Sequence, residues 1–266
     1  MLTTKPSERG ASPERARAAI LTSTVLLAVA AAAWLHVVWM AMHDDMAGMD
    51  MAMMPSLGGG LAYTAAWGVM MTAMMLPSAL PMMALYAATR RGAGAPGAPG
   101  LPVALFTVIY LGVWAATGVP MYLASVALSA ADDGGRAYAT AGMLLLAGVF
   151  QLSSLKQACL RRCRSPLGFF LGHWRGGWRG GARIAWAHAA YCLGCCWALM
   201  VVLVWAGAMG LVWVLLVSAV VAAEKLLPGG EWIARATGLA LLLLGAAVAA
   251  QPGLAGALRG GGGPSM

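Results

Sequence analysis

Residues 61–88 read LAYTAAWGVMMTAMMLPSALPMMALYAA and contain no charged side chain. A membrane-spanning helix needs roughly 20 mostly apolar residues, and this stretch is long enough. Comparable apolar stretches lie near residues 18–40, 102–128, 137–158, 184–206, 209–226 and 234–250. The sequence therefore predicts an all-α protein, a polytopic transmembrane helical bundle with six to seven spans.

Composition supports a membrane protein and excludes an ordinary soluble core. The chain is 61% hydrophobic and only 10% charged, with a mean hydropathy of +0.77. Such values are typical of integral membrane proteins. The net charge of +8 is spread over loops between apolar segments, so it does not indicate a nucleic-acid partner. The partner that composition implies is the lipid bilayer.

Charged residues in alternate loops predict the orientation. Basic residues gather before the first span, after the second, and between the fourth and fifth, at Lys5, Arg9, Arg15, Arg17, Arg90, Arg91, Arg161, Arg162, Arg164, Arg175, Arg179 and Arg183. The other loops carry Asp44, Asp45 and Asp50, then Asp132 and Asp133 beside Arg136. The positive-inside rule then places the N-terminus in the cytoplasm and predicts a multi-pass membrane protein.

The loops are too short to form a second domain. We expect a flexible cytoplasmic tail over 1–17, one transmembrane bundle over 18–250, and a disordered tail over 251–266. The first apolar segment lacks a clear cleavage site and is interpreted as a retained helix. The segment 41–59 is predicted to be an outer loop rich in Met, His and Asp.

Methionine is concentrated in one part of the chain, because 13 of the 19 methionines lie between Met40 and Met83. A thioether is a soft, neutral donor that suits Cu(I). At the outer end of the first span and in the loop after it, the candidate ligands are His36, Met40, His43, Met46 and Met49. The alternative is that these methionines only fill apolar surface.

The second span carries a methionine stripe. With about 3.6 residues per helical turn, Met71, Met74 and Met75 share a face, and Met70 begins the neighbouring row. These four are candidate copper ligands, although a methionine stripe in a membrane helix can equally be packing. Pro77 and Pro81 interrupt the backbone hydrogen bonding beside the stripe.

The fifth span carries thiols and an imidazole at helical spacing. His188, Cys192, Cys196 and Met200 recur every four residues, and Cys195 lies beside them. Thiolates with imidazole are strong ligands for Cu(I) or Zn(II). The alternative is that the cysteines pack as small hydrophobes. None of the five cysteines of the chain falls in a predicted outer loop, so a disulfide framework is not expected.

Several polar side chains lie deep in the apolar segments. Gln151 and Lys156 fall in the fourth span, and Glu224 and Lys225 end the sixth. Polar groups in hydrocarbon are costly and normally face a partner or a cavity. We expect a structural role, with Glu224 and Lys225 either paired with the fourth span or in contact with water.

The chain lacks a phosphate-binding loop, a nucleotide fingerprint, a nucleophile elbow and a zinc-protease helix. This argues against an ATP-driven pump within the chain. No catalytic residue is predicted, and an enzyme is not the favoured interpretation.

Four ordered motifs resemble a known family. They are Trp67-x-x-Met70-x-x-Ala73-Met74-Met75-x-Pro77, Gln151-x4-Lys156-x-x-Cys159-Leu160-x-x-Cys163-Arg164-x-Pro166, Tyr191-Cys192-x-Gly194-Cys195-Cys196-Trp197-x-x-Met200 and Glu224-Lys225-x-x-Pro228. Together, over roughly residues 60–230, they resemble a bacterial family of predicted metal-binding integral membrane proteins that are often labelled copper chaperones. The resemblance implies that these motif residues carry the family's metal site and that the protein is a multi-pass protein of the bacterial cytoplasmic (inner) membrane. The loop at 41–59 lies outside the motifs.

The sequence therefore predicts a membrane protein that captures Cu(I) and relays or delivers it, with a cuproenzyme or a metallochaperone as partner. Two alternatives remain open. One is a non-catalytic assembly subunit whose methionines only pack. The other is a redox membrane protein that uses copper, or haem held by His36 and His188.

Overall fold

The structure is a computed structural model that describes residues 13–43, 56–92, 100–173, 177–205 and 210–258. Within these ranges the chain is almost entirely helical and contains no strand, which confirms the all-α prediction. The helices are α1 (Pro13–Met42), α3 (Leu57–Gly92), α4 (Gly100–Ala116), α5 (Gly118–Ser129), α6 (Asp133–Leu152), α7 (Ser154–Arg164), α8 (Pro166–His173), α9 (Gly177–Trp205), α10 (Leu211–Leu226), α11 (Gly230–Ala250) and α12 (Leu254–Leu258).

Five spans of the described chain are long and apolar enough to cross a membrane: α1, α3, α4 with α5, α9 and α11. A sixth is formed if the bent pair α6 and α7 counts as one span. Helix α10, in the predicted segment 209–226, has 16 residues and falls short of the usual length. The count therefore meets the lower end of the predicted six to seven. The cytoplasmic position of the N-terminus stays a prediction.

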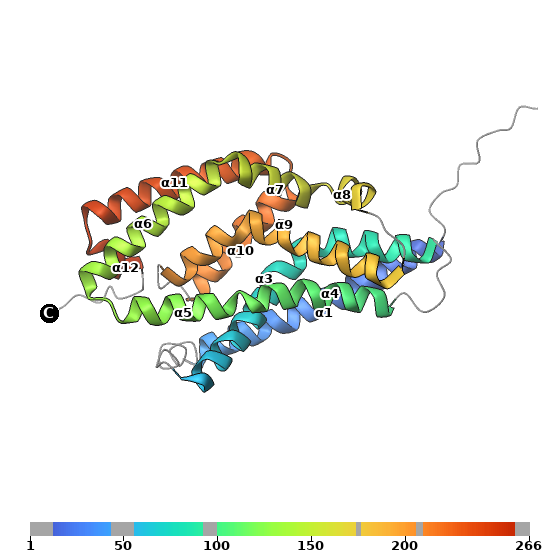
Figure 1. Cartoon of the computed structure of the whole chain (residues 1–266), viewed down its shortest axis with the longest axis horizontal. Coiled ribbons are helices and arrows are strands. Elements are labelled where there is room, and N and C mark those ends of the chain that lie inside the picture. The colour runs from blue at the N-terminus through green and yellow to red at the C-terminus, as the bar shows by residue number, and fades with distance from the viewer. Residues whose placement is uncertain (1–12, 44–55, 93–99, 174–176, 206–209, 259–266) are drawn as a thin grey trace, which may run out of the picture.

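The bundle is built from two long helix pairs joined through α9 and α10 (Figure 1). Helix α1 packs along α3, and α6 packs along α11. Helix α9 contacts α4, α6 and α7, while α10 contacts α3, α9 and α11. As a result, α9 and α10 lie at the centre of the bundle, and side chains from four different helices can meet there.

Close packing of α6 on α11 depends on small residues. A Cβ added to Gly238 would lie 2.9 Å from Cβ of Gln151 and 3.1 Å from the carbonyl oxygen of Gly148. Such contacts leave no room for a side chain, and small residues allow helices in lipid to approach this closely.

The span formed by α6 and α7 bends by 62° at its break. Ser153 has an extended backbone there, and its Oγ accepts a hydrogen bond from the backbone N–H of Lys156. The bend starts a new helix whose first turn carries Lys156, and that side chain is fully buried among α9 and α10. The break therefore directs a charged residue into the bundle.

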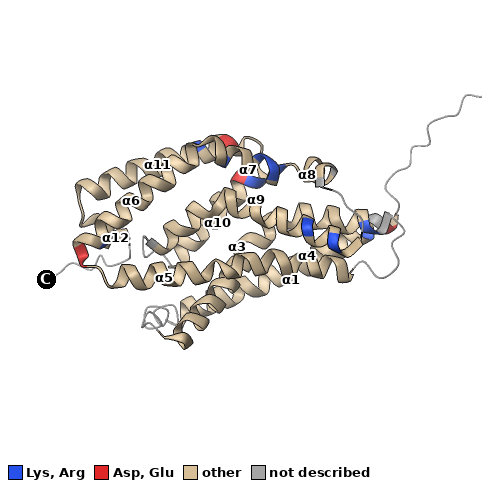
Figure 2. Ribbon diagram, in the orientation of Figure 1, with Lys and Arg blue, Asp and Glu red and all other residues tan. Residues whose placement is uncertain are grey.

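Charge is distributed unevenly over the molecule (Figure 2). Asp133 lies at one end of the bundle, at the start of α6, and basic residues lie on α7 and toward the other end. This distribution agrees with the loop charges on which the predicted orientation rests.

Two boundaries differ from the sequence prediction. Helix α1 begins at Pro13, within the segment predicted to be a tail. Residues 254–258, assigned to a disordered C-terminal tail, form α12, which packs on α6 and buries Ala255. Its apolar residues at 254, 255, 257 and 258 explain the packing, which the glycines around them obscure in the sequence.

Candidate metal centre

Three thiols of α9 form the centre of the candidate site. Cys192, Cys195 and Cys196 are each only 1% exposed. The Sγ atoms of Cys195 and Cys196 are 3.3 Å apart, and the Cys195 thiol donates to the carbonyl oxygen of Cys192 at 3.2 Å. The helical spacing seen in the sequence thus produces a compact group of buried thiols.

A fourth thiol reaches this group from α7. The Sγ atoms of Cys163 and Cys195 are 3.7 Å apart. Two sulfurs that share a tetrahedral metal ion at about 2.3 Å lie roughly 3.8 Å apart, so this spacing suits shared coordination. Among the described residues, no group of three or more His, Cys, Asp or Glu side chains has an arrangement that could hold a metal ion as it stands. The thiols are therefore neighbours that would have to rotate to bind one.

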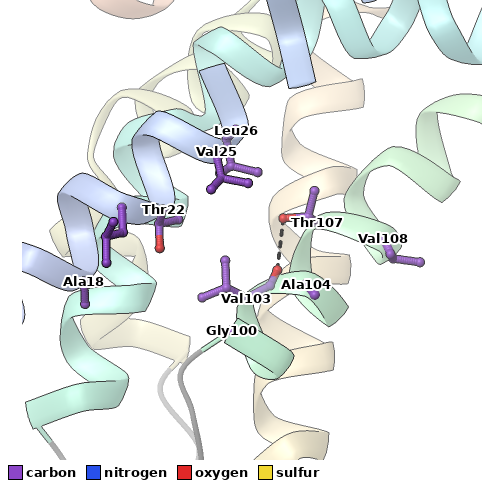
Figure 3. A pocket seen from close by; sticks show the side chains of 10 residues that line it. Ala18, Thr22, Val25, Leu26, Gly100, Val103, Ala104, Thr107 and Val108 are labelled. Atoms are coloured by element: carbon purple, nitrogen blue, oxygen red, sulfur yellow. Dashed lines mark hydrogen bonds between the residues drawn. The ribbon is translucent and has the colours of Figure 1, made fainter. Parts of the chain in front are cut away.

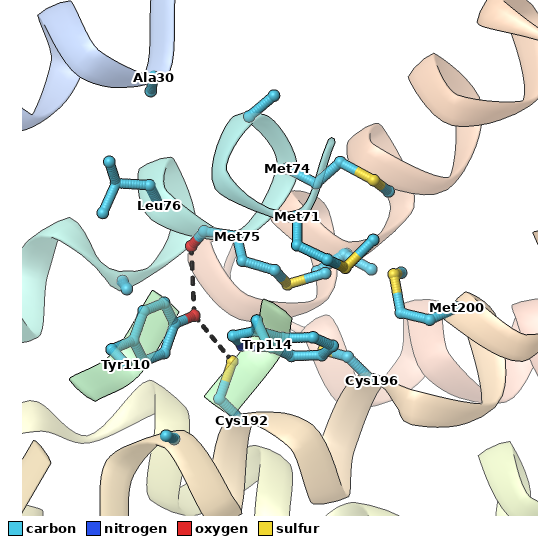
Figure 4. Close-up of a cluster of buried hydrophobic side chains, with 14 of the residues drawn as sticks. Ala30, Met71, Met74, Met75, Leu76, Tyr110, Trp114, Cys192, Cys196 and Met200 are labelled. Carbon is cyan, nitrogen blue, oxygen red and sulfur yellow. Dashed lines mark hydrogen bonds between the residues drawn. The ribbon is translucent and has the colours of Figure 1, made fainter. Parts of the chain in front are cut away.

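Tyr110 of α4 connects the thiols to the methionine helix. Its hydroxyl oxygen lies 3.0 Å from Sγ of Cys192 and donates to the carbonyl oxygen of Met75 at 3.4 Å (Figure 4). Spans two and five, which the sequence could not place relative to one another, are thus brought together through α4. One aromatic side chain bridges the thiol and thioether groups.

The predicted methionine ligands surround the same space. Met70, Met71, Met74 and Met75 of α3 are all buried, as is Met200 of α9. Figure 4 shows Met71 and Met200 pointing toward one another, with Met75 beside Tyr110 and Cys192. All belong to one hydrophobic cluster that also contains the α9 thiols. The structure thereby gathers soft donors that lie more than 100 residues apart in the sequence.

A buried ammonium group lies against this cluster. Nζ of Lys225 is 3.1 Å from Sγ of Cys192, 3.1 Å from Oγ of Ser78 and 3.9 Å from Sδ of Met75. None of the described carboxylates pairs with it. A buried cation needs a compensating negative charge, and a Cys192 thiolate is the nearest group that can supply one.

A second polar network fixes the helices around the thiols. Lys156 donates to Oε2 of Glu224 at 2.6 Å and to the carbonyl oxygen of Cys195 at 2.5 Å, while Gln151 donates to Oε1 of Glu224 at 2.8 Å. Lys156, Gln151 and Glu224 are fully buried. Of the two alternatives left open for Glu224, the structure has the pairing with the fourth span, and this pairing ties α6, α7 and α10 to the backbone of α9.

His188 lies one helical turn before Cys192 and is buried among aromatic rings. Its ring centroid is 5.5 Å from that of Tyr110, 5.8 Å from Phe169 and 6.0 Å from Phe106. Its Nε2 atom is buried and has no hydrogen-bond partner among the described residues. The imidazole is therefore near the thiols, and one nitrogen remains free to bind.

The candidates on α1 lie apart from this cluster. His36 and His43 are exposed and flank the ring of Trp39, and Met40 is half-buried. Met46 and Met49 lie outside the described residues. His36 therefore does not join the methionine stripe inside the bundle, because the buried face of α1 is formed by residues such as Ala33 and Val37.

One apolar groove in the described part of the chain is unrelated to the thiols. It lies between α1 and α4, has a volume of about 450 Å³, and is lined by residues such as Ala18, Val25 and Val103 (Figure 3). No thiol, thioether or imidazole lines it, so it offers no soft ligand.

Comparison with protein families adds an independent observation. A family model, PpoB2, described as a copper chaperone, matches residues 64–248. The chain belongs to this family. The match contains every cysteine and the α3 methionines, whereas α1 and the segment 41–59 lie outside it. Membership of the PpoB2 family supports a copper-handling role, and it confirms the resemblance seen in the four sequence motifs.

Neither the curated proteins nor the solved structures contain a significant match to this chain. The role of individual residues therefore has to be argued from the geometry. Three members of the cluster were not among the ligands predicted from sequence: Cys163, Tyr110 and Lys225. Cys163 and Lys225 belong to the four sequence motifs, and that membership could have identified them as site residues. No feature of the sequence pointed to Tyr110.

Proposed function

We propose that this protein is a membrane-embedded copper carrier that holds Cu(I) among the buried thiols of α9 and the thioethers of α3. The observation that carries the proposal is the meeting of Cys192, Cys195, Cys196, Met75 and Met200 in one enclosed space. Soft sulfur ligands select Cu(I) over harder cations. Enclosure within an apolar bundle would keep water and competing ligands away from the ion.

The mixture of ligand types suits a carrier better than a permanent store. A thiolate binds strongly, whereas a neutral thioether binds weakly and exchanges. An ion held by one or two thiolates could move to a neighbouring sulfur without leaving the cluster. His188 offers a further donor one turn away. Delivery to a cuproenzyme or a metallochaperone would follow from such exchange.

Capture of copper outside the membrane belongs to the same proposal. His36, Met40 and His43 lie toward the end of α1 that precedes the methionine-rich segment 41–59. Their exposure leaves them available to an incoming ion. The positive-inside rule places this end outside the bacterial inner membrane.

The haem alternative is weakened by the positions of the two histidines. His36 is exposed on α1, while His188 is buried on α9 among aromatic side chains. A haem held by both would need them to face one another across a common space. The packing alternative predicts the same burial of methionines but does not explain why the buried ammonium of Lys225, which pairs with none of the described carboxylates, lies beside a thiol.

The test is a copper-loading experiment. Detergent-purified protein would be reduced, loaded with Cu(I), desalted and analysed for metal by mass spectrometry. We expect stoichiometric copper in the wild type and loss of it in a Cys192→Ser, Cys195→Ser, Cys196→Ser variant. A folded wild type that holds no copper would contradict the proposal.

Two controls separate the site from general effects. Ser218→Ala changes a hydroxyl on α10 that bonds only its own helix, to Val214, and should leave copper binding intact. Circular dichroism of the triple variant shows whether the helices persist. If a correctly folded triple variant kept its copper, the three thiols would not be the copper ligands.

A further inference from the structure

Two cysteines of α7 extend the thiol cluster toward the surface. Cys159 and Cys163 are one helical turn apart on α7, and both are half-buried, unlike the three buried thiols of α9. Residues spaced by four share one face of a helix. This face is turned toward α9, because Sγ of Cys163 lies 3.7 Å from Sγ of Cys195.

The second cysteine also rests on α9. A Cβ added to Gly194 would lie 3.0 Å from Sγ of Cys159. A side chain at position 194 would therefore push Cys159 away, and glycine is what lets this thiol sit against the helix. Cys159 and Cys163 thus flank the Gly194–Cys195 segment from the outside.

The surface beside these thiols is basic. Arg161 and Arg162 lie two and three residues after Cys159 and are exposed, and Arg161 makes only a long contact of 3.8 Å with Glu231. Figure 2 shows positive charge gathered on α7. A positive patch attracts anionic partners and speeds their association.

We propose that Cys159 and Cys163 form the port through which Cu(I) passes between the buried cluster and an anionic acceptor docked on the basic face of α7. This rests on the proposed function, since it requires copper at the α9 thiols. The order of ligands would run from Cys195 to Cys163 and then to Cys159.

The transfer is ligand exchange and involves no electron transfer. Sγ of Cys163 forms a bond to Cu(I) as the bond from Cys195 breaks, and the proton lost from Cys163 passes to the released thiolate. Sγ of Cys159 then forms a bond to Cu(I) as the bond to Cys163 breaks, and the proton lost from Cys159 passes to the Cys163 thiolate. The acceptor ligand finally binds copper as the bond to Cys159 breaks, and the released Cys159 thiolate takes up a proton from the acceptor ligand or from water. Copper remains Cu(I) throughout. The 3.7 Å separation allows both sulfurs to bind the ion during the exchange.

The experiment measures the rate of copper release. Protein loaded with Cu(I) would be mixed with the anionic chelator bicinchoninate, and its coloured Cu(I) complex followed in a stopped-flow instrument. The Cys159→Ser variant, which keeps Cys163 in the cluster, should start with the same copper content as the wild type and release it at least tenfold more slowly. Ser165→Ala, at the exposed end of the same helix, should behave as wild type.

Other results of the release experiment would contradict the proposed port. An unchanged release rate in the fully loaded Cys159→Ser variant would overturn the port. So would loss of all copper from that variant, because Cys159 would then be a holding ligand. A wild type that binds no copper would instead overturn the proposed function itself.

The basic docking face is tested by an Arg161→Gln, Arg162→Gln variant. This variant should release copper to bicinchoninate more slowly than the wild type at low salt. The two rates should match at high salt, where surface charges are screened. Equal rates at low salt would refute the basic docking face.

Discussion

Nζ of Lys225 and Sγ of Cys192 are 3.1 Å apart inside the bundle, although 33 residues separate them. The described carboxylates do not compensate this ammonium, because Glu224 is already paired with Lys156. The candidate site therefore contains one fixed positive charge, which only a neighbouring thiolate can offset. An entering ion is repelled by this charge in proportion to its own charge, so a monovalent ion is favoured over a divalent one.

Removing that charge should broaden metal selectivity. Two unit charges about 5 Å apart repel by roughly 3 kcal/mol at an effective dielectric constant of 20. A divalent ion would bear about twice this cost. In Lys225→Met, Zn(II) affinity should therefore rise at least tenfold relative to Cu(I), as measured by competition with chelators. Lys225→Arg keeps the charge and should keep the selectivity; an unchanged ratio in Lys225→Met would count against the charge filter.

Breaking the buried ion pair should destabilise the protein strongly. Removing one member of such a pair leaves an uncompensated charge and typically costs about 3–5 kcal/mol. Lys156→Met should therefore lower the thermal unfolding midpoint markedly, followed by circular dichroism in detergent. Asp133→Asn removes an exposed contact to Arg136 and should change the midpoint little. Equal midpoints for the two variants would show that the pair between Lys156 and Glu224 is not holding the helices.

Contact between α6 and α11 should be sensitive to a single methyl group. Gly238→Ala places a Cβ within 2.9 Å of Gln151, and such overpacking commonly costs about 1–3 kcal/mol. The unfolding midpoint should fall. Gly142→Ala, on α6 with nothing within 4 Å of the added Cβ, should leave it unchanged or raise it, because alanine is the better helix former. A harmless Gly238→Ala would mean that the helices pack less closely than described.

Methionine sulfur can be tested separately from methionine volume. Met71→Leu with Met75→Leu roughly conserves side-chain volume, so the fold should survive at a cost below about 1.5 kcal/mol for each site. Copper affinity should nevertheless fall, which a chelator competition would measure. Met143→Leu, on α6, is the matched control. Unaltered affinity in the double variant would favour the packing interpretation of the stripe.

Much of the architecture was predictable because lipid imposes a simple rule. A backbone in hydrocarbon must satisfy its hydrogen bonds internally, so long apolar stretches become helices. The stretch 61–88 lies within α3, as expected. The bend at Ser153 was not predictable from hydropathy, since 137–158 is one apolar segment in which a local change of backbone conformation divides α6 from α7.

The site was predictable in part, and for a clear reason. Periodicity reveals which residues share a face of one helix, and it correctly grouped Cys192 with Cys196. It cannot reveal which helices touch, so the contacts of Cys192 with Tyr110 and Lys225 were beyond it. The expectation that Lys156 and Glu224 serve structure agrees with their pairing, but the pairing also fixes the backbone of Cys195.

X-ray absorption at the copper edge tests the central claim most directly. It reports the oxidation state of bound copper and the elements that coordinate it. In the wild-type protein loaded with one equivalent, we predict Cu(I) with a first shell of sulfur only, and loss of that shell in the Cys192→Ser, Cys195→Ser, Cys196→Ser variant. A first shell of nitrogen and oxygen in the wild type would contradict a copper site in the buried sulfur cluster.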